Sequence, residues 1–196
     1  MKSGHSRQQR RQQQEAQLAT HFSSPSAPRL HAIYSSDLTR CKQTAEAIGA
    51  PLSLQVNFSP QLRERHLGLL QGLTIKEAAT QQPLALQCLG GSTSRKIPAE
   101  SGCVGQGESV DELCSRVSAE IERIAAQHPG QRALLVAHGG VIAAAHRRAT
   151  GEQAARAHNG CINVLRVQGN KWAVVSWGDI SIVGDASGNF GGGEGG

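Results

Sequence analysis

The sequence predicts an α/β fold, a three-layer sandwich built around a mostly parallel β-sheet. Strand-length apolar runs alternate along the chain with amphipathic helical stretches. Two of these units, around residues 30 and 133, pass from a strand through a short polar turn into a helix. The chain has 196 residues, 38% of them hydrophobic, which is enough for one domain with a core and short for two.

The N-terminal part of the chain predicts one helix and one β-turn-α unit. The helix covers residues 10–22, and the two prolines of "SSPSAPRL" end it. Residues 30–34 form a short strand, Ser35 or Ser36 caps the next helix, and Gly49 closes that helix. The core-facing stripe of the second helix consists of Leu38, Cys41, Ala45 and Ile48.

The middle of the chain predicts a strand, two helical stretches and a long loop. "LSLQVNF" resembles a strand, and the charged loop "QLRERHLGLLQGLT" follows it. Residues 75–88 are helical as far as Pro83, and the Gly- and Ser-rich residues 89–107 form an exposed loop. Ser109 and Glu112 then form a capping box that starts a helix. The buried face of this helix consists of Leu113, Val117, Ile121 and Ile124.

The C-terminal part predicts a second β-turn-α unit and a hairpin. Residues 133–137 form the strand, and the helix runs from about residue 140 to residue 150. "CINVLRVQGNKWAVVSWGD" contains two strand-like runs around the turn residues Gly169 and Asn170. The three expected regions of the chain are therefore a basic flexible arm (1–13), one folded domain (14–182) and a Gly-rich disordered tail (183–196).

The charge of the chain is concentrated at its N-terminus. Residues 1–14 contain four basic residues and no acid, so they carry +4 of the formal charge of +5. The rest of the chain is nearly neutral, and only 3% of all residues are aromatic. Nucleic acid is therefore not an expected partner, and binding through the basic arm ranks as a minor hypothesis.

Neither a membrane span nor a bound metal is expected. The apolar runs are of strand length, too short to cross a bilayer. The five cysteines are scattered, without a C-x-x-C pair or a histidine at zinc spacing. We therefore expect no metal, no cofactor and no disulfide framework, and a reducing, cytoplasmic location. The Arg- and Gln-rich start partly suits a transit peptide, so an organelle such as the plastid is an alternative for a full-length form.

Polar residues follow both strands that lead into helices. Ser35, Ser36 and Arg40 follow the first strand, and His138 follows the second. The carboxyl ends of parallel strands form a ligand crevice, and a guanidinium beside a helix N-terminus suits a phosphate or carboxylate. The simpler alternatives are a solvated surface arginine and a histidine that only hydrogen-bonds at a strand end. Glu64, in the charged loop, is by local pattern an ordinary loop carboxylate.

Four motifs together resemble the histidine phosphatase superfamily, also called the phosphoglycerate mutase-like fold. They are "YSSDLTRCKQTAEAI", "LRERHLGLLQG", "GES" and "VAHGGVI", which occur in the family's order and approximate spacing. The resemblance covers about residues 14–182. "RERHLG", "KWAVVSWGDIS" and the glycine-rich end are most similar to the plant phosphoglycerate mutase-like proteins described as metal-independent phosphoserine phosphatases.

The resemblance implies a covalent mechanism through a phosphohistidine, with a small phosphorylated metabolite as substrate. Arg40 matches the phosphate-binding arginine, Glu64 the proton donor, and His138 the second, phosphate-binding histidine. Asn159 matches a residue near the phosphate pocket. Positioning and charge neutralisation are the physical requirements of such a phosphoryl transfer.

The family's first strand, which ends in Arg-His-Gly, has no counterpart in this sequence. The histidine of that tripeptide is the family's nucleophile, and His5 is the only histidine upstream of the first predicted helix. We therefore expect a sheet that lacks the first central strand and carries a gap or unpaired edges. We also expect impaired phosphoenzyme chemistry, as in a truncated gene model, an alternative transcript or a pseudoenzyme.

Three functions remain open at this point. The first is a phosphomonoester phosphatase of the phosphoserine phosphatase type, impaired because the nucleophile is absent. The second is a non-catalytic pseudophosphatase that binds phosphate. The third is a phosphoglycerate mutase, disfavoured because the chain is short. The sequence leaves both the substrate and the oligomeric state open.

Overall fold

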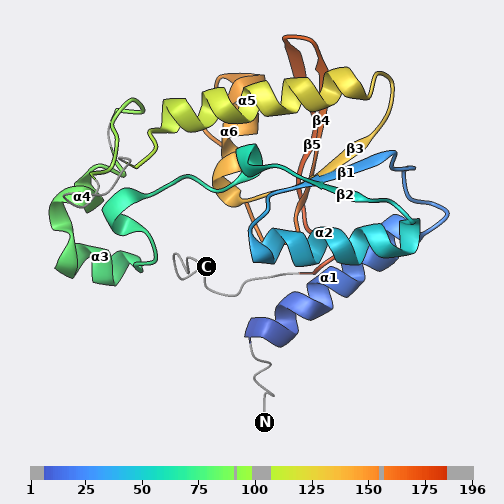
Figure 1. The fold of residues 1–196 in the computed structure, drawn as a ribbon, viewed down its shortest axis with the longest axis horizontal. Coiled ribbons are helices and arrows are strands. Elements are labelled where there is room, and N and C mark those ends of the chain that lie inside the picture. The colour runs from blue at the N-terminus through green and yellow to red at the C-terminus, as the bar shows by residue number, and fades with distance from the viewer. Residues whose placement is uncertain (1–6, 91, 99–106, 155–156, 185–196) are drawn as a thin grey trace.

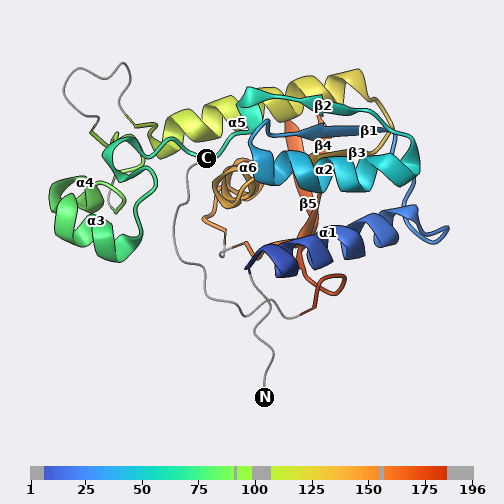
Figure 2. The same cartoon turned by 60° about the horizontal axis from the view of Figure 1, so that its bottom comes forward.

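The computed structural model describes residues 7–90, 92–98, 107–154 and 157–184, which form a three-layer α/β sandwich (Figures 1 and 2). The central sheet has the order β2-β1-β3, with β1 at Ala32–Ser35, β2 at Val56–Phe58 and β3 at Ala133–Val136. Both pairings are parallel. All four residues of β1 are buried, as expected for a central strand covered on both faces.

Helices cover both faces of this sheet. One face carries α1 (Arg7–Ser23) and α2 (Thr39–Leu52), and the other carries α5 (Val110–Gln127) and α6 (Gly139–Thr150). Each face has its own apolar cluster, with Ile33 and Ile48 on the α1/α2 side. Val117 and Val141 lie in the cluster on the α5/α6 side. The α/β sandwich predicted from the alternating pattern is confirmed.

The C-terminal hairpin forms a sheet of its own. β4 (Ile162–Gln168) and β5 (Lys171–Asp179) pair antiparallel around the turn at Gly169 and Asn170. Within the described residues, no strand pairs with the second edge of β3. All four residues of this apolar strand are therefore only half-buried, in contrast to β1. This is the unpaired edge expected of a sheet without its first central strand.

Two short helices form an outlying lobe, on the left in both views (Figures 1 and 2). They are α3 (Ile75–Gln81) and α4 (Pro83–Gln87), and two single 3-10 turns, η1 (Pro60–Leu62) and η2 (Gly68–Leu70), precede them. The lobe has a small core of Leu70, Ala78, Ala85 and Ile97. The expectation of an exposed loop over residues 89–107 was wrong at Ile97, which is fully buried because its side chain fills this core.

Three local predictions need correction. α1 begins at Arg7, so residues 7–13 are helical rather than a flexible arm, because arginine and glutamine are good helix formers. Val183, assigned to the tail, packs against the α1/α2 core. Gly49 does not end α2, which runs on to Leu52 and ends at Ser53 in the left-handed conformation. Gly49 is instead a packing position, since a Cβ there would lie 2.8 Å from the Leu54 carbonyl oxygen.

Neither Ser35 nor Ser36 caps α2. The N-cap is Leu38, which has no capping side chain, because α2 begins only at Thr39. Ser36 Oγ instead accepts a hydrogen bond from the Leu38 N–H, before the helix, and contacts His138 across the sheet. The capping box of Ser109 and Glu112 at the start of α5 is confirmed, with both reciprocal hydrogen bonds present. Among the described residues, no helix has the length and apolar character needed to cross a membrane. His5 and the rest of the Gly-rich tail lie outside the described residues.

Candidate active site

The register of β1 against β3 brings two polar strand ends together. Ser35 pairs with Val136, and the next residue, Ser36, donates its backbone N–H to the Val136 carbonyl at 3.0 Å. His138 follows β3 two residues later and is the N-cap of α6. Its Nε2 lies 2.8 Å from Ser36 Oγ, and its ring is only 6% exposed. The two β-turn-α units therefore meet at one buried hydrogen bond.

Arg40 joins this pair from the first turn of α2. Its Nε donates to His138 Nδ1 at 3.1 Å. An accepting Nδ1 carries no proton, so the proton of the neutral ring lies on Nε2, facing Ser36 Oγ. Burial, together with the nearby Arg40 and Arg116 guanidinium groups, lowers the pKa of His138 to about 4. His138 is therefore neutral at physiological pH.

Cys41 is a buried neighbour of His138 in this cluster. Its Sγ lies 3.5 Å from His138 Nε2 and 3.5 Å from the Ala137 carbonyl oxygen. Burial raises the pKa of Cys41 to about 12, against the lowering influence of Arg40 and with a further rise from Glu64. The thiol is thus protonated and unreactive, and Arg40 supplies the positive charge of the cluster.

Glu64 reaches the same region from the loop after β2. Its Oε2 accepts a hydrogen bond from the Gly140 N–H, in the first turn of α6, at 3.1 Å. Its Oε1 accepts one from the Arg65 N–H at 2.8 Å. The carboxylate therefore lies at the N-terminus of the helix that His138 caps, where a negative charge is favoured.

A network centred on Arg116 holds the loop that carries Glu64. Arg116 pairs with both carboxylate oxygens of Glu108 at 2.8 Å. Its Nη1 donates to the carbonyl oxygens of Gln61, at 2.5 Å, and Arg63, at 3.1 Å. Arg65 Nε donates to the Glu108 carbonyl oxygen at 2.8 Å. The main chain on both sides of Glu64 is therefore fixed by charge-assisted hydrogen bonds.

An open cavity of about 480 Å³ lies beside Glu64. Its charged side chains are paired: Arg116 with Glu108, and Lys96 with Glu112 at 2.5 Å. Arg63 pairs outside the cavity, with Asp37 at 2.6 Å. The full lining is Pro60, Arg63, Glu64, His66, Lys96, Glu108, Glu112 and Arg116. The cavity is therefore lined by side chains of both charges, with Glu64 among them.

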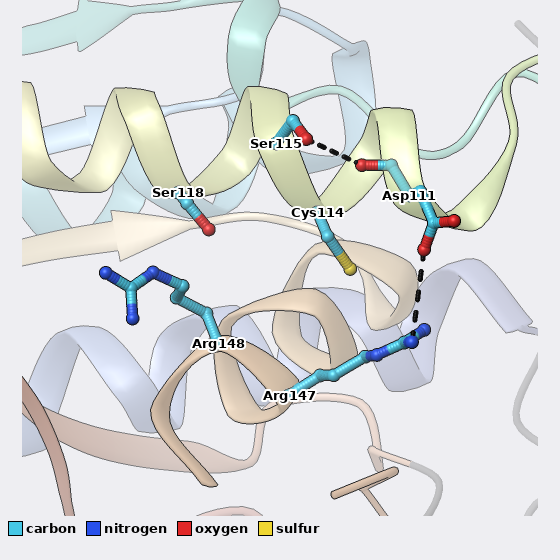
Figure 3. Close-up of a pocket in the computed structure, with 6 residues that line it drawn as sticks. All are labelled: Asp111, Cys114, Ser115, Ser118, Arg147 and Arg148. Carbon is cyan, nitrogen blue, oxygen red and sulfur yellow. Dashed lines mark hydrogen bonds and ion pairs between the residues drawn. The ribbon is translucent and has the colours of Figure 1, made fainter. Parts of the chain in front are cut away.

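A second cavity, of about 400 Å³, lies between α5 and α6 and contains none of the predicted site residues (Figure 3). Arg147 there makes a loose ion pair with Asp111 at 3.9 Å. Arg148 binds Glu122 and the Asn170 carbonyl oxygen and stacks over Trp172. Figure 3 shows the two guanidinium groups pointing apart, so they do not converge on one anion.

The structure brings together three of the four predicted site residues. Arg40 and His138 are in direct contact, and Glu64 is linked to the His138 helix through Gly140. Asn159 lies in the exposed turn before β4, and the described part of the chain shows no hydrogen bond from it to the other three.

Sequence reasoning missed three contributors to the site, namely Cys41, Gly140 and Arg116. It placed Ser36 at the ligand crevice but did not predict its hydrogen bond with His138. The register of two parallel strands identifies Ser36, and the pair of glycines after His138 is a local signal for Gly140. Arg116 lies eight residues after Glu108, about two helical turns, but its backbone partners belong to a distant loop. No local pattern indicates that contact.

Comparison with known proteins identifies the family of this chain. The family model of the histidine phosphatase superfamily (branch 1) matches residues 9–180. Two relatives from Arabidopsis thaliana are a metal-independent phosphoserine phosphatase, 40% identical over 156 residues, and phosphoglycerate mutase-like protein 4, 39% identical over 154 residues. Each alignment covers 76% of this chain, which spans only 62% and 64% of the length of these two relatives.

Solved structures share the fold. Bacillus stearothermophilus YhfR superimposes with a TM-score of 0.74 at 22% identity, covering 91% of this chain and 86% of that one. A mycobacterial glucosyl-3-phosphoglycerate phosphatase in complex with inorganic phosphate gives a TM-score of 0.69 at 25% identity, covering 90% of this chain and 88% of that one. The Arg40–His138 pair lies where the two parallel strands end, and the family model matches residues 9–180. The chain therefore belongs to the histidine phosphatase superfamily, branch 1.

Proposed function

We propose that this chain binds the phosphoryl group of a small phosphomonoester between Arg40 and His138, as a phosphatase of the phosphoserine phosphatase type. The names of two relatives, a phosphoserine phosphatase and a glucosyl-3-phosphoglycerate phosphatase, support a small phosphorylated metabolite as the substrate class. The covalent step is impaired in this chain. Asn159 is proposed as a further contact at the rim of the phosphate pocket.

The hydrogen-bonding state of Arg40 carries this proposal. Its Nε donates to the neutral His138 at 3.1 Å, so its two Nη groups take no part in that bond. A guanidinium fixed at Nε presents its two Nη groups as a preorganised fork, which matches two oxygens of a phosphoryl group. The adjacent N-termini of α2 and α6 favour the same negative charge.

Glu64 is placed to serve as the proton donor. In the phosphohistidine mechanism a histidine nitrogen attacks phosphorus, the ester P–O bond breaks, and the leaving oxygen takes a proton from the carboxylic acid. Water then attacks the phosphohistidine, the P–N bond breaks, and the carboxylate takes up the proton released by that water. The cavity beside Glu64 would hold the leaving alcohol.

The nucleophilic histidine is the missing part of this mechanism. The sequence contains no Arg-His-Gly, and among the described residues no second histidine contacts Arg40 or His138. Arginine, neutral histidine and a carboxylic acid cannot replace a covalent step. The same residues that support phosphate binding therefore also support the alternative of a pseudophosphatase, which binds the ester without hydrolysing it.

Replacing Arg40 by alanine is expected to weaken phosphate binding. Loss of the guanidinium fork removes charge-assisted hydrogen bonds, which corresponds to an increase of about tenfold or more in Kd. Isothermal titration with inorganic phosphate measures this change. Lys42→Ala, which removes one positive charge from the same helix at an exposed position, is the matched control and should leave Kd within about twofold. Equal effects of the two variants would refute a specific role of Arg40.

Hydrolysis is expected to be absent or very slow in the chain as it stands. The protein is incubated with phosphoserine and with an aryl phosphate in the presence of a metal chelator, and released phosphate is measured. Without a nucleophile, the turnover should not exceed that of the His138→Ala variant. Turnover clearly above this control would show that the chain completes the covalent step and would exclude the pseudophosphatase alternative.

The neutral state of His138 predicts how stability depends on pH. The unfolded chain binds this proton below about pH 6.5, whereas the folded chain binds it only near pH 4. The stability tied to neutral His138 is therefore complete above pH 6.5 and is lost as the pH falls toward 4. Relative to His138→Gln, the free energy of unfolding should fall by roughly 2–3 kcal/mol over this range.

Urea unfolding at a series of pH values measures this difference. Arg40, Arg116 and Asp37 are the charged groups that act on His138. His158→Gln, at an exposed position, is the control and should follow the wild-type curve. Parallel curves for wild type and His138→Gln would mean that His138 titrates normally in the folded protein.

A further inference from the structure

Gly140 occupies a position where a side chain cannot fit without moving Glu64. A Cβ built on Gly140 would overlap Glu64 Oε1 and lie 3.2 Å from Glu64 Cδ, whereas its distance from Leu113 Cδ2 is an ordinary 3.5 Å. Gly140 also donates its N–H to the other oxygen of the same carboxylate. The backbone at Gly140 therefore provides a position for the Glu64 carboxylate, and this position is open only because residue 140 has no side chain.

The loop that carries Glu64 is not free to withdraw. Arg116, whose side chain is 20% exposed, binds the carbonyl oxygens of Gln61 and Arg63 while it is held by Glu108. A Cβ at residue 140 would thus be accommodated by rotation of the flexible Glu64 side chain rather than by movement of the loop. The carboxylate would leave the N-terminus of α6 and lose its hydrogen bond there.

The neighbouring glycine provides an internal comparison. Gly139 lies in the same first turn of α6, and a Cβ built on it would meet nothing within 4 Å. Alanine is a better helix former than glycine, so substitution at Gly139 carries no structural penalty. The two adjacent glycines therefore differ in one respect, the contact with Glu64.

We propose that Gly140 is a positioning residue for Glu64, holding its carboxylate against the start of α6 beside the phosphate pocket. This inference rests on the proposed function for its consequence in binding. The ionised carboxylate held there repels a phosphate dianion, whereas its protonated form, the carboxylic acid, can donate its proton to the leaving ester oxygen. Glu64 acts electrostatically on Cys41, whose Sγ contacts His138.

The test compares Gly140→Ala with Gly139→Ala in the full chain. Displacing the Glu64 charge should tighten the binding of inorganic phosphate at neutral pH by about two- to fivefold, because one nearby negative charge is removed. Gly139→Ala should leave Kd unchanged. Equal phosphate affinities for the two alanine variants, with both near wild type, would overturn the proposal.

Two further variants, Glu64→Ala and Glu64→Gln, separate the steric effect of a side chain at residue 140 from the effect of the Glu64 charge. In Glu64→Ala the clash partner is gone, so adding Gly140→Ala should change neither phosphate affinity nor the urea midpoint beyond the effect of Gly139→Ala. In Glu64→Gln the displaced group is neutral, so adding Gly140→Ala should shift the urea midpoint but not the phosphate affinity. A purely structural role of Gly140 would not produce this dependence of phosphate affinity on the charge of residue 64. Additive effects in all backgrounds would contradict the coupling.

The urea midpoints also distinguish this inference from the proposed function. If no variant and no wild-type protein binds phosphate, the proposed function is wrong. The coupling between residues 140 and 64 in urea unfolding is still measured in that case. If the midpoint shift caused by Gly140→Ala vanishes in the Glu64→Ala background, the positioning of Glu64 by Gly140 is supported. If the shift persists in that background, this positioning role is refuted.

Discussion

The parallel pairing of β1 with β3 is the constraint on which the candidate site depends. Because Ser35 lies opposite Val136, Ser36 and His138 emerge at the same edge of the sheet and meet through one hydrogen bond. The helices that follow these strands begin at that edge, so Arg40 and Gly140, each in the first turn of its helix, both lie there. A one-residue slip would turn these side chains to opposite faces and dissolve the cluster.

Burial then decides the chemistry of this cluster. His138 is neutral and Cys41 is protonated, each for the same reason, because a low-dielectric environment disfavours the charged form of a lone group. Arg40 lies beside this neutral ring and donates its Nε–H to it. Glu64 is held at the start of α6, on a loop that Arg116 fixes through the carbonyl oxygens of Gln61 and Arg63. A guanidinium, a neutral ring and a carboxyl group therefore gather at the N-terminus of α6, an arrangement suited to a phosphate ester.

Much of the fold, but less of the site, could be predicted from the sequence. Helical periodicity and the capping box of Ser109 locate α5, because both depend on residues close together in the chain. The position of Arg40 in the first turn of its helix follows in the same way. Ser36 was misassigned as a cap because its partner, His138, lies 102 residues away. The burial of Ile97 and the contact of Gly140 with Glu64 likewise depend on distant segments, for which a local pattern carries no signal.

The central claim is that Arg40 and His138 form a phosphate site, and a crystal structure grown or soaked with inorganic phosphate at neutral pH tests it most directly. The account predicts an anion that accepts hydrogen bonds from both Nη groups of Arg40, at about 2.7–2.9 Å, and contacts His138. It also predicts that Glu64 lies on the side of the anion facing the cavity lined by Lys96 and Glu112. An anion bound only at Arg147 or Lys96, with Arg40 turned to solvent, would contradict it.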